Sequence, residues 1–340
     1  MAREARGLTQ NELAVKSGVA QGTISKIEDS LLSPSDELVL KFEEVLKFPR
    51  HFFAIQRRIE WSTAGVGLYR RRVVIPSVVL KQCEAKMNII KLNIAKLLSA
   101  AEPTGNQIPN IDPDEAGGAI QAAKMTRIAF RLPPGPVRNL TDAVEAAGCI
   151  IVPFDFVTRK IDACSMFIGD TPVIFINQSL NAFRYRWTVA HELGHLVMHR
   201  LPSESDEQED QANRFGAELL MPQDEIRASL PPLSIDRLAR HKLKWRVSMQ
   251  AILCHAKNIG VISERKLRYD FMMINRLGYR EVEPHDNDVP KETPRLLKEL
   301  VDMHLQDLST STRELADELA IGESDLASWF LGRPELRVVN

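Results

Sequence analysis

The feature that most restricts the fold of this 340-residue chain is a pair of histidines spaced one helical turn apart. His191 and His195 fit the pattern H-E-x-x-H, with Glu192 between them. Residues four apart share one face of an α-helix, so two imidazoles at this spacing can hold one tetrahedral ion at roughly 2.0–2.1 Å per nitrogen. Apolar residues recur around them at helical spacing, which predicts a buried helix beside a dry cleft. The alternative is a pair of helix histidines held by neighbouring carboxylates.

The residue between the histidines supplies the expected chemistry. Glu192 would project beside the open coordination position and take a proton from water, whose pKa a zinc ion lowers to about 7. We therefore expect Zn²⁺ as the cofactor and peptide hydrolysis as the reaction. His199 continues the spacing, but three ligands on one straight helix would span about 12 Å at a rise of roughly 1.5 Å per residue. We expect a structural or supporting role for His199.

A third zinc ligand must come from another element. A helix is predicted at about Glu207–Leu220, and Glu209 lies on its apolar side, where a carboxylate needs a partner such as a cation. Alternatively, Glu209 only complements the dipole at the helix N-terminus. Asp206, Glu207 and Asp210 compete with Glu209 for the ligand role.

Strands and breaks are predicted before this helix pair. A hairpin is expected from Met166–Ile168 and Val173–Ile176, and a buried strand at Cys149–Pro153. Either hairpin strand could hold an extended peptide by strand addition, or the hairpin could belong only to the core. Residues 102–114 are rich in Pro, Gly, Asn and Asp and predict a linker or long surface loop, followed by a helix at Glu115–Phe130.

The N-terminal residues have the pattern of a helix-turn-helix. Thr9 can cap a helix with Glu12 as its capping-box partner, the apolar face is expected from Leu13, Ala14 and Val15, and Gly18 provides the turn. A second helix opens near Ala20 and would present its first residues to DNA. The candidate DNA contacts are Gln10, Gln21, Thr23, Ser25 and Lys26.

Charge supports this module weakly. Residues 1–50 hold seven Lys or Arg against eight Asp or Glu, a poor footprint for DNA. The alternative is a helical bundle used for dimerisation or for docking a protein. The arginines at 57, 58 and 70–72 could contact phosphates or belong to a solvated linker. The first helix is short, so either the true start lies upstream or the module is weakened.

Composition excludes several protein classes. Net charge is −1, and no apolar run approaches the roughly 18 residues of a membrane span. The N-terminus carries no apolar signal segment, so we expect a cytoplasmic protein without a membrane partner. The four cysteines form no C-x-x-C pair and are expected to be buried free thiols: Cys83, Cys149, Cys164 and Cys254.

Longer stretches resemble a known family. The span from about Arg131 to Pro222 resembles the ImmA/IrrE metallopeptidases, in RLPPGPVRNL, DACSMFIGDTPVIFIN, RYRWTVAHELGHLVMH and EDQANRFGAELLMP, and residues 232–290 look like the helical tail of longer members. The N-terminus resembles lambda-repressor/Cro domains. The family resemblance implies zinc ligands at His191, His195 and Glu209, a base at Glu192, and a stress-response regulator that cleaves a repressor. Gly216 stands where members commonly have Ala.

Together these patterns predict a multidomain, mainly α protein with a small α+β zincin-like core. The expected domains are a helix-turn-helix DNA-binding domain (1–55), a basic linker and helical connector (56–120), a zincin-like metallopeptidase domain (121–225) and a helical C-terminal region (226–340). The expected function is a regulatory zinc endopeptidase that binds operator DNA, cleaves a repressor or antitoxin and could form a homodimer. The alternative is a non-enzymatic regulator or antitoxin whose zinc domain is structural or sensory.

Overall fold

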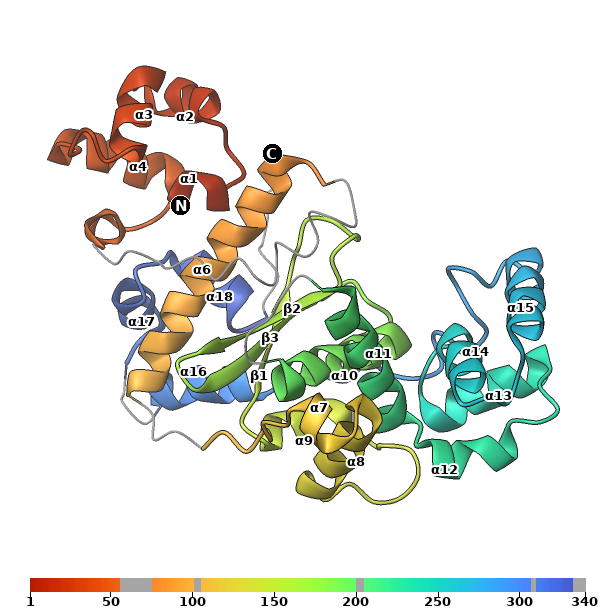
Figure 1. Cartoon of the computed structure of the whole chain (residues 1–340). Helices are drawn as coiled ribbons and strands as arrows, with labels where there is room; N and C mark the ends of the chain where they lie inside the picture. The colour runs from red at the N-terminus through yellow and green to blue at the C-terminus, as the bar shows by residue number, and fades with distance from the viewer. Residues whose placement is uncertain (56–74, 101–104, 200–204, 307–309, 333–340) are drawn as a thin grey trace. The chain divides into compact units, whose positions relative to one another are not determined.

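The computed structural model describes residues 1–55, 75–100, 105–199, 205–306 and 310–332 (Figure 1). The chain divides into two compact units. Unit 1 contains Met1–Pro103, Val152–Ile161 and Arg295–Asn340, and unit 2 contains Thr104–Ile151 and Asp162–Pro294. Most of the described residues are helical and one small sheet is present, which confirms the predicted fold class. No helix among the described residues is both long and apolar enough to span a membrane.

The N-terminal helices of unit 1 follow the predicted pattern. Thr9 and Glu12 form the capping box at the start of α2 (Gln10–Ser17), and Gly18 ends the same helix with φ 66°. Val15 is 86% exposed, so its predicted place on the apolar face is wrong. Two residues correspond to about 200° of helical rotation, which carries Val15 away from the buried Leu13. The elements are α1 (Ala2–Ala5), α2 (Gln10–Ser17), α3 (Gln21–Glu28), α4 (Asp36–Leu46) and the 3₁₀ turn η1 (Arg50–Ala54).

A long helix organises the rest of unit 1. This helix, α6 (Ser77–Ser99), packs against α1 near its start and against α16 (Leu296–Gln306) near its end. There His304 Nε2 lies 3.0 Å from the Leu97 carbonyl oxygen. Two short helices, α17 (Thr312–Glu318) and α18 (Glu323–Trp329), also belong to this unit.

Among the residues that the structure describes, the sheet has three strands: β1 (Ile150–Phe154), β2 (Ala163–Ile168) and β3 (Thr171–Asn177). Their order is β1-β3-β2, and β2 pairs antiparallel with β3, from Ala163 opposite Ile176 to Ile168 opposite Thr171. The predicted hairpin is confirmed. Because β3 lies between the other two strands, β2 is the hairpin strand at an edge of the sheet.

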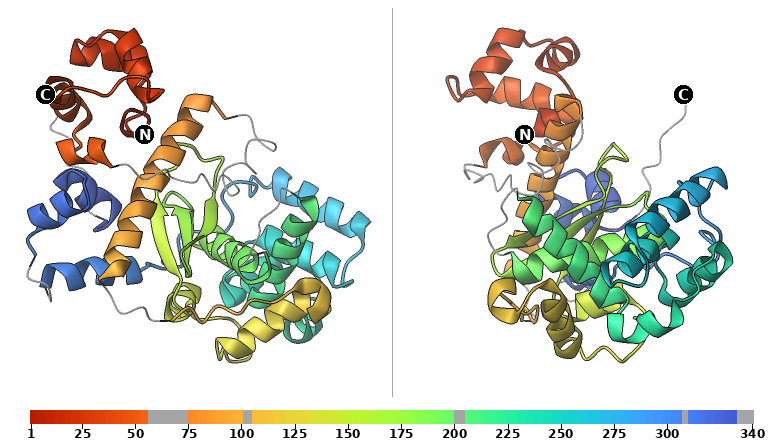
Figure 2. Two further views of the ribbon diagram at one scale, coloured as in Figure 1. Left: turned by 60° about the vertical axis from the view of Figure 1, so that its left-hand side comes forward. Right: turned by 45° about the vertical axis from the view of Figure 1, so that its right-hand side comes forward.

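Two crossing helices form the centre of unit 2. Helix α10 (Ala182–Met198) packs on β2, β3 and α11 (Asp206–Leu220), and α8 (Ala119–Ala129) packs against both α10 and α11 (Figure 2). Asn181 and Ser205 cap the two helices by accepting backbone N–H groups of the first turn. The remaining helices are α7 (Pro113–Ala116), α8 (Ala119–Ala129), α9 (Leu140–Ala146), α12 (Gln223–Ile226), η2 (Arg227–Ser229), α13 (Ile235–Trp245), α14 (Met249–Asn258) and α15 (Glu264–Arg276).

One of two predictions in this region needs correction. The helix expected at Glu115–Phe130 is two helices, because Gly117 and Gly118 take φ values of 87° and 102° and end α7. The linker or surface loop expected at 102–114 is described from residue 105, and up to α7 it is irregular and mostly exposed, with two side chains anchored in the core. Ile108 and Ile111 are buried, and the Ile111 N–H donates to the Val197 carbonyl.

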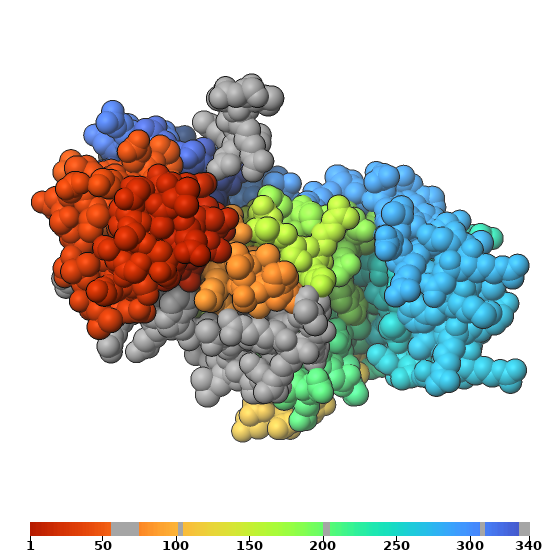
Figure 3. All heavy atoms as spheres, turned by 90° about the horizontal axis from the view of Figure 1, so that it is seen from above, coloured from red at the N-terminus to blue at the C-terminus, as the bar shows by residue number. Residues whose placement is uncertain are grey.

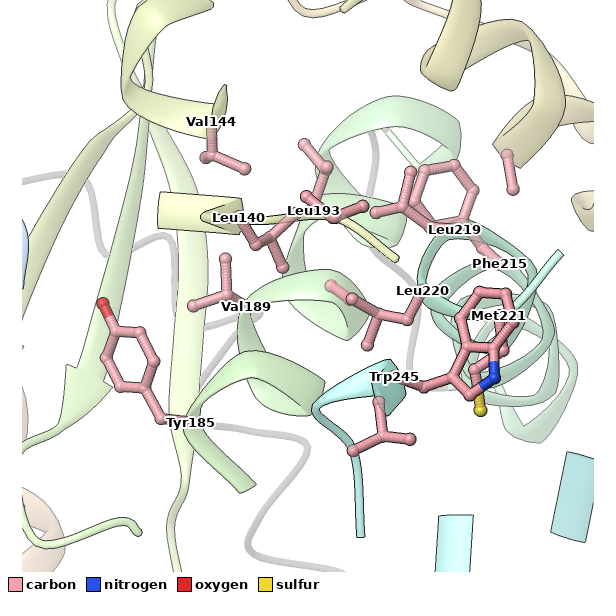
Figure 4. Close-up of a cluster of buried hydrophobic side chains, with 14 of the residues drawn as sticks. Leu140, Val144, Tyr185, Val189, Leu193, Phe215, Leu219, Leu220, Met221 and Trp245 are labelled. Atoms are coloured by element: carbon pink, nitrogen blue, oxygen red, sulfur yellow. The ribbon is translucent and has the colours of Figure 1, made fainter. Parts of the chain in front are cut away.

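The core of unit 2 is continuous around the crossing helices. Side chains from α9, α10, α11 and α13 meet in it, including Leu140, Val189, Phe215 and Trp245 (Figure 4). All four cysteines are free thiols. Cys254 on α14 is exposed, so its predicted burial is wrong, whereas the other three are buried.

Candidate metal centre

Three side chains from the two crossing helices converge on one point. His191 and His195 come from α10, and Glu209 comes from the first turns of α11. Their ligand atoms all lie within 4.8 Å of one another. The competing carboxylates lie elsewhere: Asp210 pairs with Arg214 at 2.7 Å on the exposed side of α11, and Asp206 and Glu207 are exposed.

The spacing of these atoms fits a small tetrahedral ion. The two Nε2 atoms are 3.2 Å apart, and the Glu209 oxygens lie 3.4 Å from His195 Nε2 and 3.7 Å from His191 Nε2. Four ligands at roughly 2.0–2.2 Å from a tetrahedral ion are separated from each other by roughly 3.3–3.6 Å. Two nitrogen donors and one carboxylate are also the donor set of catalytic zinc sites.

The hydrogen bond of His191 determines which ring nitrogen faces the site. Its Nδ1 lies 3.1 Å from the amide oxygen Oδ1 of Asn213 on α11. An amide oxygen only accepts, so Nδ1 carries the proton and donates it. In the neutral ring, Nε2 then has a lone pair directed toward the other ligands.

His195 reaches the same state through a relay of two residues. His199 Nε2 lies 2.7 Å from Gln211 Oε1, so His199 donates from Nε2 and its Nδ1 is an acceptor. His195 Nδ1, at 3.0 Å, must donate to that nitrogen, which leaves the lone pair on His195 Nε2. Two lone pairs 3.2 Å apart with no proton between them repel each other, and a cation between them removes that repulsion.

Burial favours the neutral rings on which this arrangement depends. Burial lowers the pKa of His191 below its ordinary value, and the nearby charge of Glu192 opposes the shift. Burial likewise lowers the pKa of His199, which is 7% exposed. Both rings are therefore neutral near pH 7, as metal binding requires.

The side chain expected to act as the base is held by the edge strand. Glu192 is buried on α10, and its Oε2 accepts a hydrogen bond of 2.6 Å from the Ser165 hydroxyl on β2. Ser165, Gln211 and Asn213 were not among the predicted site residues. They contact the site across elements, so no local spacing marks them.

Two of the predicted DNA-contacting residues, Gln10 and Gln21, are the first residues of α2 and α3. Gln21, the first residue of α3, donates from Nε2 to Gln10 Oε1 at 2.7 Å, and Gln10 donates to Glu28 Oε2 at 2.7 Å. Glu28 is held in turn by the Arg3 guanidinium at 2.6 Å. This chain of contacts fixes the orientation of the Gln21 amide.

The other candidate DNA contacts differ in how far their side chains are exposed. Lys26 is exposed, while Thr23 and Ser25 are partly buried, and the Ser25 hydroxyl donates to Asp29 at 3.2 Å. The arginines at 57, 58 and 70–72 lie outside the described residues.

Comparison with protein-family models matches two parts of the chain. Residues 144–256 match the IrrE N-terminal-like domain of peptidase family M78, and residues 1–53 match a helix-turn-helix domain. No curated protein matches the chain. The chain therefore matches a helix-turn-helix domain first and an IrrE N-terminal-like domain after it, in the order that the sequence resemblance predicted.

Proposed function

We propose that this protein is a zinc-dependent endopeptidase that regulates transcription, with a protein substrate and a DNA site. The observation that carries the proposal is the triangle of His191, His195 and Glu209 beside the buried carboxylate of Glu192. A purely structural zinc site would have no use for a base at that position.

In the proposed hydrolysis, three residues would bind zinc and Glu192 would act as the base. Zinc, when bound by the three ligands, supplies a Lewis acid that lowers the pKa of a bound water and polarises the peptide carbonyl. Glu192 takes the proton of the attacking water. Because its Oε2 accepts the Ser165 hydroxyl, Oε1 is the atom that would receive that proton.

The edge strand provides a means to hold the substrate. β2 lies at the edge of the sheet, packs against α10 and carries Ser165. We infer that an extended segment of a repressor or antitoxin protein adds to this strand, which would bring a peptide bond beside Glu192.

The helix-turn-helix domain gives the regulatory half of the proposal. A helix of this kind enters the major groove with its first residues toward the bases. The Gln21 amide, fixed by Gln10, can then pair with an adenine edge. Domains of this type usually occupy symmetric sites as dimers, so a dimer on operator DNA remains a prediction.

Zinc content is the first test. Purified wild-type protein should hold about one zinc per chain, and His195→Ala should lose it. A wild-type protein that takes up no zinc, even when zinc is supplied, contradicts the proposal and leaves a DNA-binding regulator.

The second test separates hydrolysis from binding. Glu192→Gln keeps the zinc ligands and should retain zinc while partner cleavage and gene derepression disappear. Ser165→Ala should weaken cleavage less than Glu192→Gln. If derepression survives in Glu192→Gln although cleavage is lost, derepression does not need hydrolysis and the non-enzymatic alternative holds. If cleavage itself survives, Glu192 is not the base of the reaction.

A further inference from the structure

The helix-turn-helix residues share a cavity with a helix outside the module. A cavity of about 390 Å³ opens in unit 1, between the start of α2 and the start of α6. In the space-filling view from above, the surface of the N-terminal helices (red) adjoins that of α6 (orange) (Figure 3). The walls used below are Gln10, Asn11 and Gln21 on one side and Ser77, Val78 and Lys81 on the other.

The start of α6 packs against the end of α1 at this position. Gln82 Nε2 donates to the Ala5 carbonyl at 3.5 Å, and Ala5 is fully buried. A Cβ on Gly7, whose φ is 68°, would lie 2.9 Å from the Gln82 side chain, so the two segments are in close contact. The position of Lys81 relative to α2 therefore follows from packing.

DNA bound to the helix-turn-helix domain would lie next to this cavity. In helix-turn-helix complexes the second helix reads bases with its first residues, while the first helix crosses the sugar–phosphate backbone. Gln21 begins α3 and Gln10 begins α2, and both line the cavity. A duplex read by Gln21 therefore brings a backbone phosphate to the mouth of the cavity, opposite Lys81.

Charge explains why a cation from outside the module is useful there. Residues 1–50 carry one more acidic than basic side chain, and Arg3 at the cavity is already paired with Glu28. Lys81 is exposed and has no ion pair with any other residue that the structure describes. Lys81 can thus give its charge to a phosphate without breaking a contact.

We propose that the start of α6 is part of the DNA interface and that Lys81 binds a backbone phosphate at this cavity. The inference rests on the proposed DNA binding of the helix-turn-helix domain. It extends the DNA-contacting surface beyond the residues matched to that domain, to a helix that follows it in sequence.

Salt dependence of DNA binding tests this contact. The full-length protein first selects a duplex from a random library, and the affinity for that duplex is then measured across a salt series. Losing one phosphate contact should lower the salt slope of Lys81→Gln by about one. Accordingly, the affinity gap between wild type and variant should shrink about 3.5-fold as salt rises from roughly 50 to 200 mM.

Matched variants distinguish this contact from general charge. Lys81→Arg should keep the wild-type slope, and so should Lys86→Gln, which removes a lysine of the same helix that does not line the cavity. An unchanged slope in Lys81→Gln, or tighter binding, overturns the inference while DNA binding stands. If the wild-type protein selects no duplex, the proposed DNA binding fails together with it, and the zinc proposal is unaffected.

Discussion

At the scale of single residues, two amide side chains of α11 orient the histidines that we propose as metal ligands. Asn213 and Gln211 both present an oxygen to a histidine N–H, one directly to His191 and one through His199. Partners of this kind fix the ring tautomer and typically change metal affinity 10–100-fold. The H-E-x-x-H spacing predicted His191, His195 and Glu192 as site residues because all three lie along one helix. Asn213 and Gln211 act across two helices, so the sequence alone could not assign them.

Zinc affinity of Asn213 variants tests this control. Asn213→Ala removes the oxygen that holds His191 and should bind zinc about 10–100-fold more weakly. Asn213→Asp keeps an acceptor and should stay near wild type. The measurement is competition with a chelator of known affinity.

Controls for this prediction come from the same helix and the same rings. Arg214→Ala changes a neighbouring side chain that pairs with Asp210 and does not contact the histidines. ¹⁵N NMR of the metal-free protein should also show His191 and His195 protonated at Nδ1. Equal zinc affinity in Asn213→Ala and Arg214→Ala would remove the argument for tautomer control.

At the scale of elements, two glycines allow α10 and α11 to cross closely. A Cβ on Gly194 would lie 3.0 Å from Phe215 Cδ1 and 3.3 Å from Ala212 Cα, closer than side chains normally approach. A Cβ on Gly216 would lie 3.4 Å from the backbone nitrogen of His191, an ordinary contact. The two glycines of the crossing are therefore not equivalent, although both occupy helix interiors.

Alanine at each position separates these two cases. Gly194→Ala must push α10 from α11, so we expect a loss of about 1–3 kcal/mol in the free energy of unfolding and weaker zinc binding. Gly216→Ala should be neutral or stabilise by up to about 1 kcal/mol, from helix propensity. Thermal unfolding of the metal-free proteins and zinc titration measure both. Equal effects at the two positions would show that the crossing distance does not control the site.

The elements also show where local patterns are sufficient. The capping box predicted the start of α2, and apolar spacing predicted α10 and α11, since these signals act within one helix. The break between α7 and α8 was missed because apolar spacing continues through Gly117 and Gly118. Which hairpin strand lies at the edge depends on β1, whose place in the sheet no hairpin signal contains.

At the scale of the whole molecule, residues from both ends of the chain meet in unit 1. Arg6 on the α1 side donates to both carboxylate oxygens of Asp325 on α18, at 2.7 and 2.6 Å, and also to the Leu46 carbonyl. Asp325 is 1% exposed. A Cβ on Gly322 would lie 3.2 Å from the Lys47 carbonyl oxygen, so α18 closely approaches the end of α4. No local sequence pattern indicates a contact between residues that are 319 positions apart. The domain boundaries remain a prediction.

This pairing predicts that the C-terminal helices stabilise the helix-turn-helix domain. Asp325→Ala removes the buried partner of Arg6, which is partly exposed and can regain water, so we expect a loss of about 1–3 kcal/mol. Amide hydrogen exchange should then become faster in α2–α4 as well as in α18. Asp325→Asn should lose less, because it still accepts a hydrogen bond from Arg6. Asp317→Ala on α17, whose side chain is 72% exposed, should change stability by less than about 0.5 kcal/mol.

Faster exchange confined to α17 and α18 would mean that residues 1–54 hold their fold without the C-terminal helices. In that case the Asp325 carboxylate would stabilise only α18. Arg6 would then be held by its hydrogen bond to the Leu46 carbonyl and by its contact with the Phe48 ring 4.3 Å away.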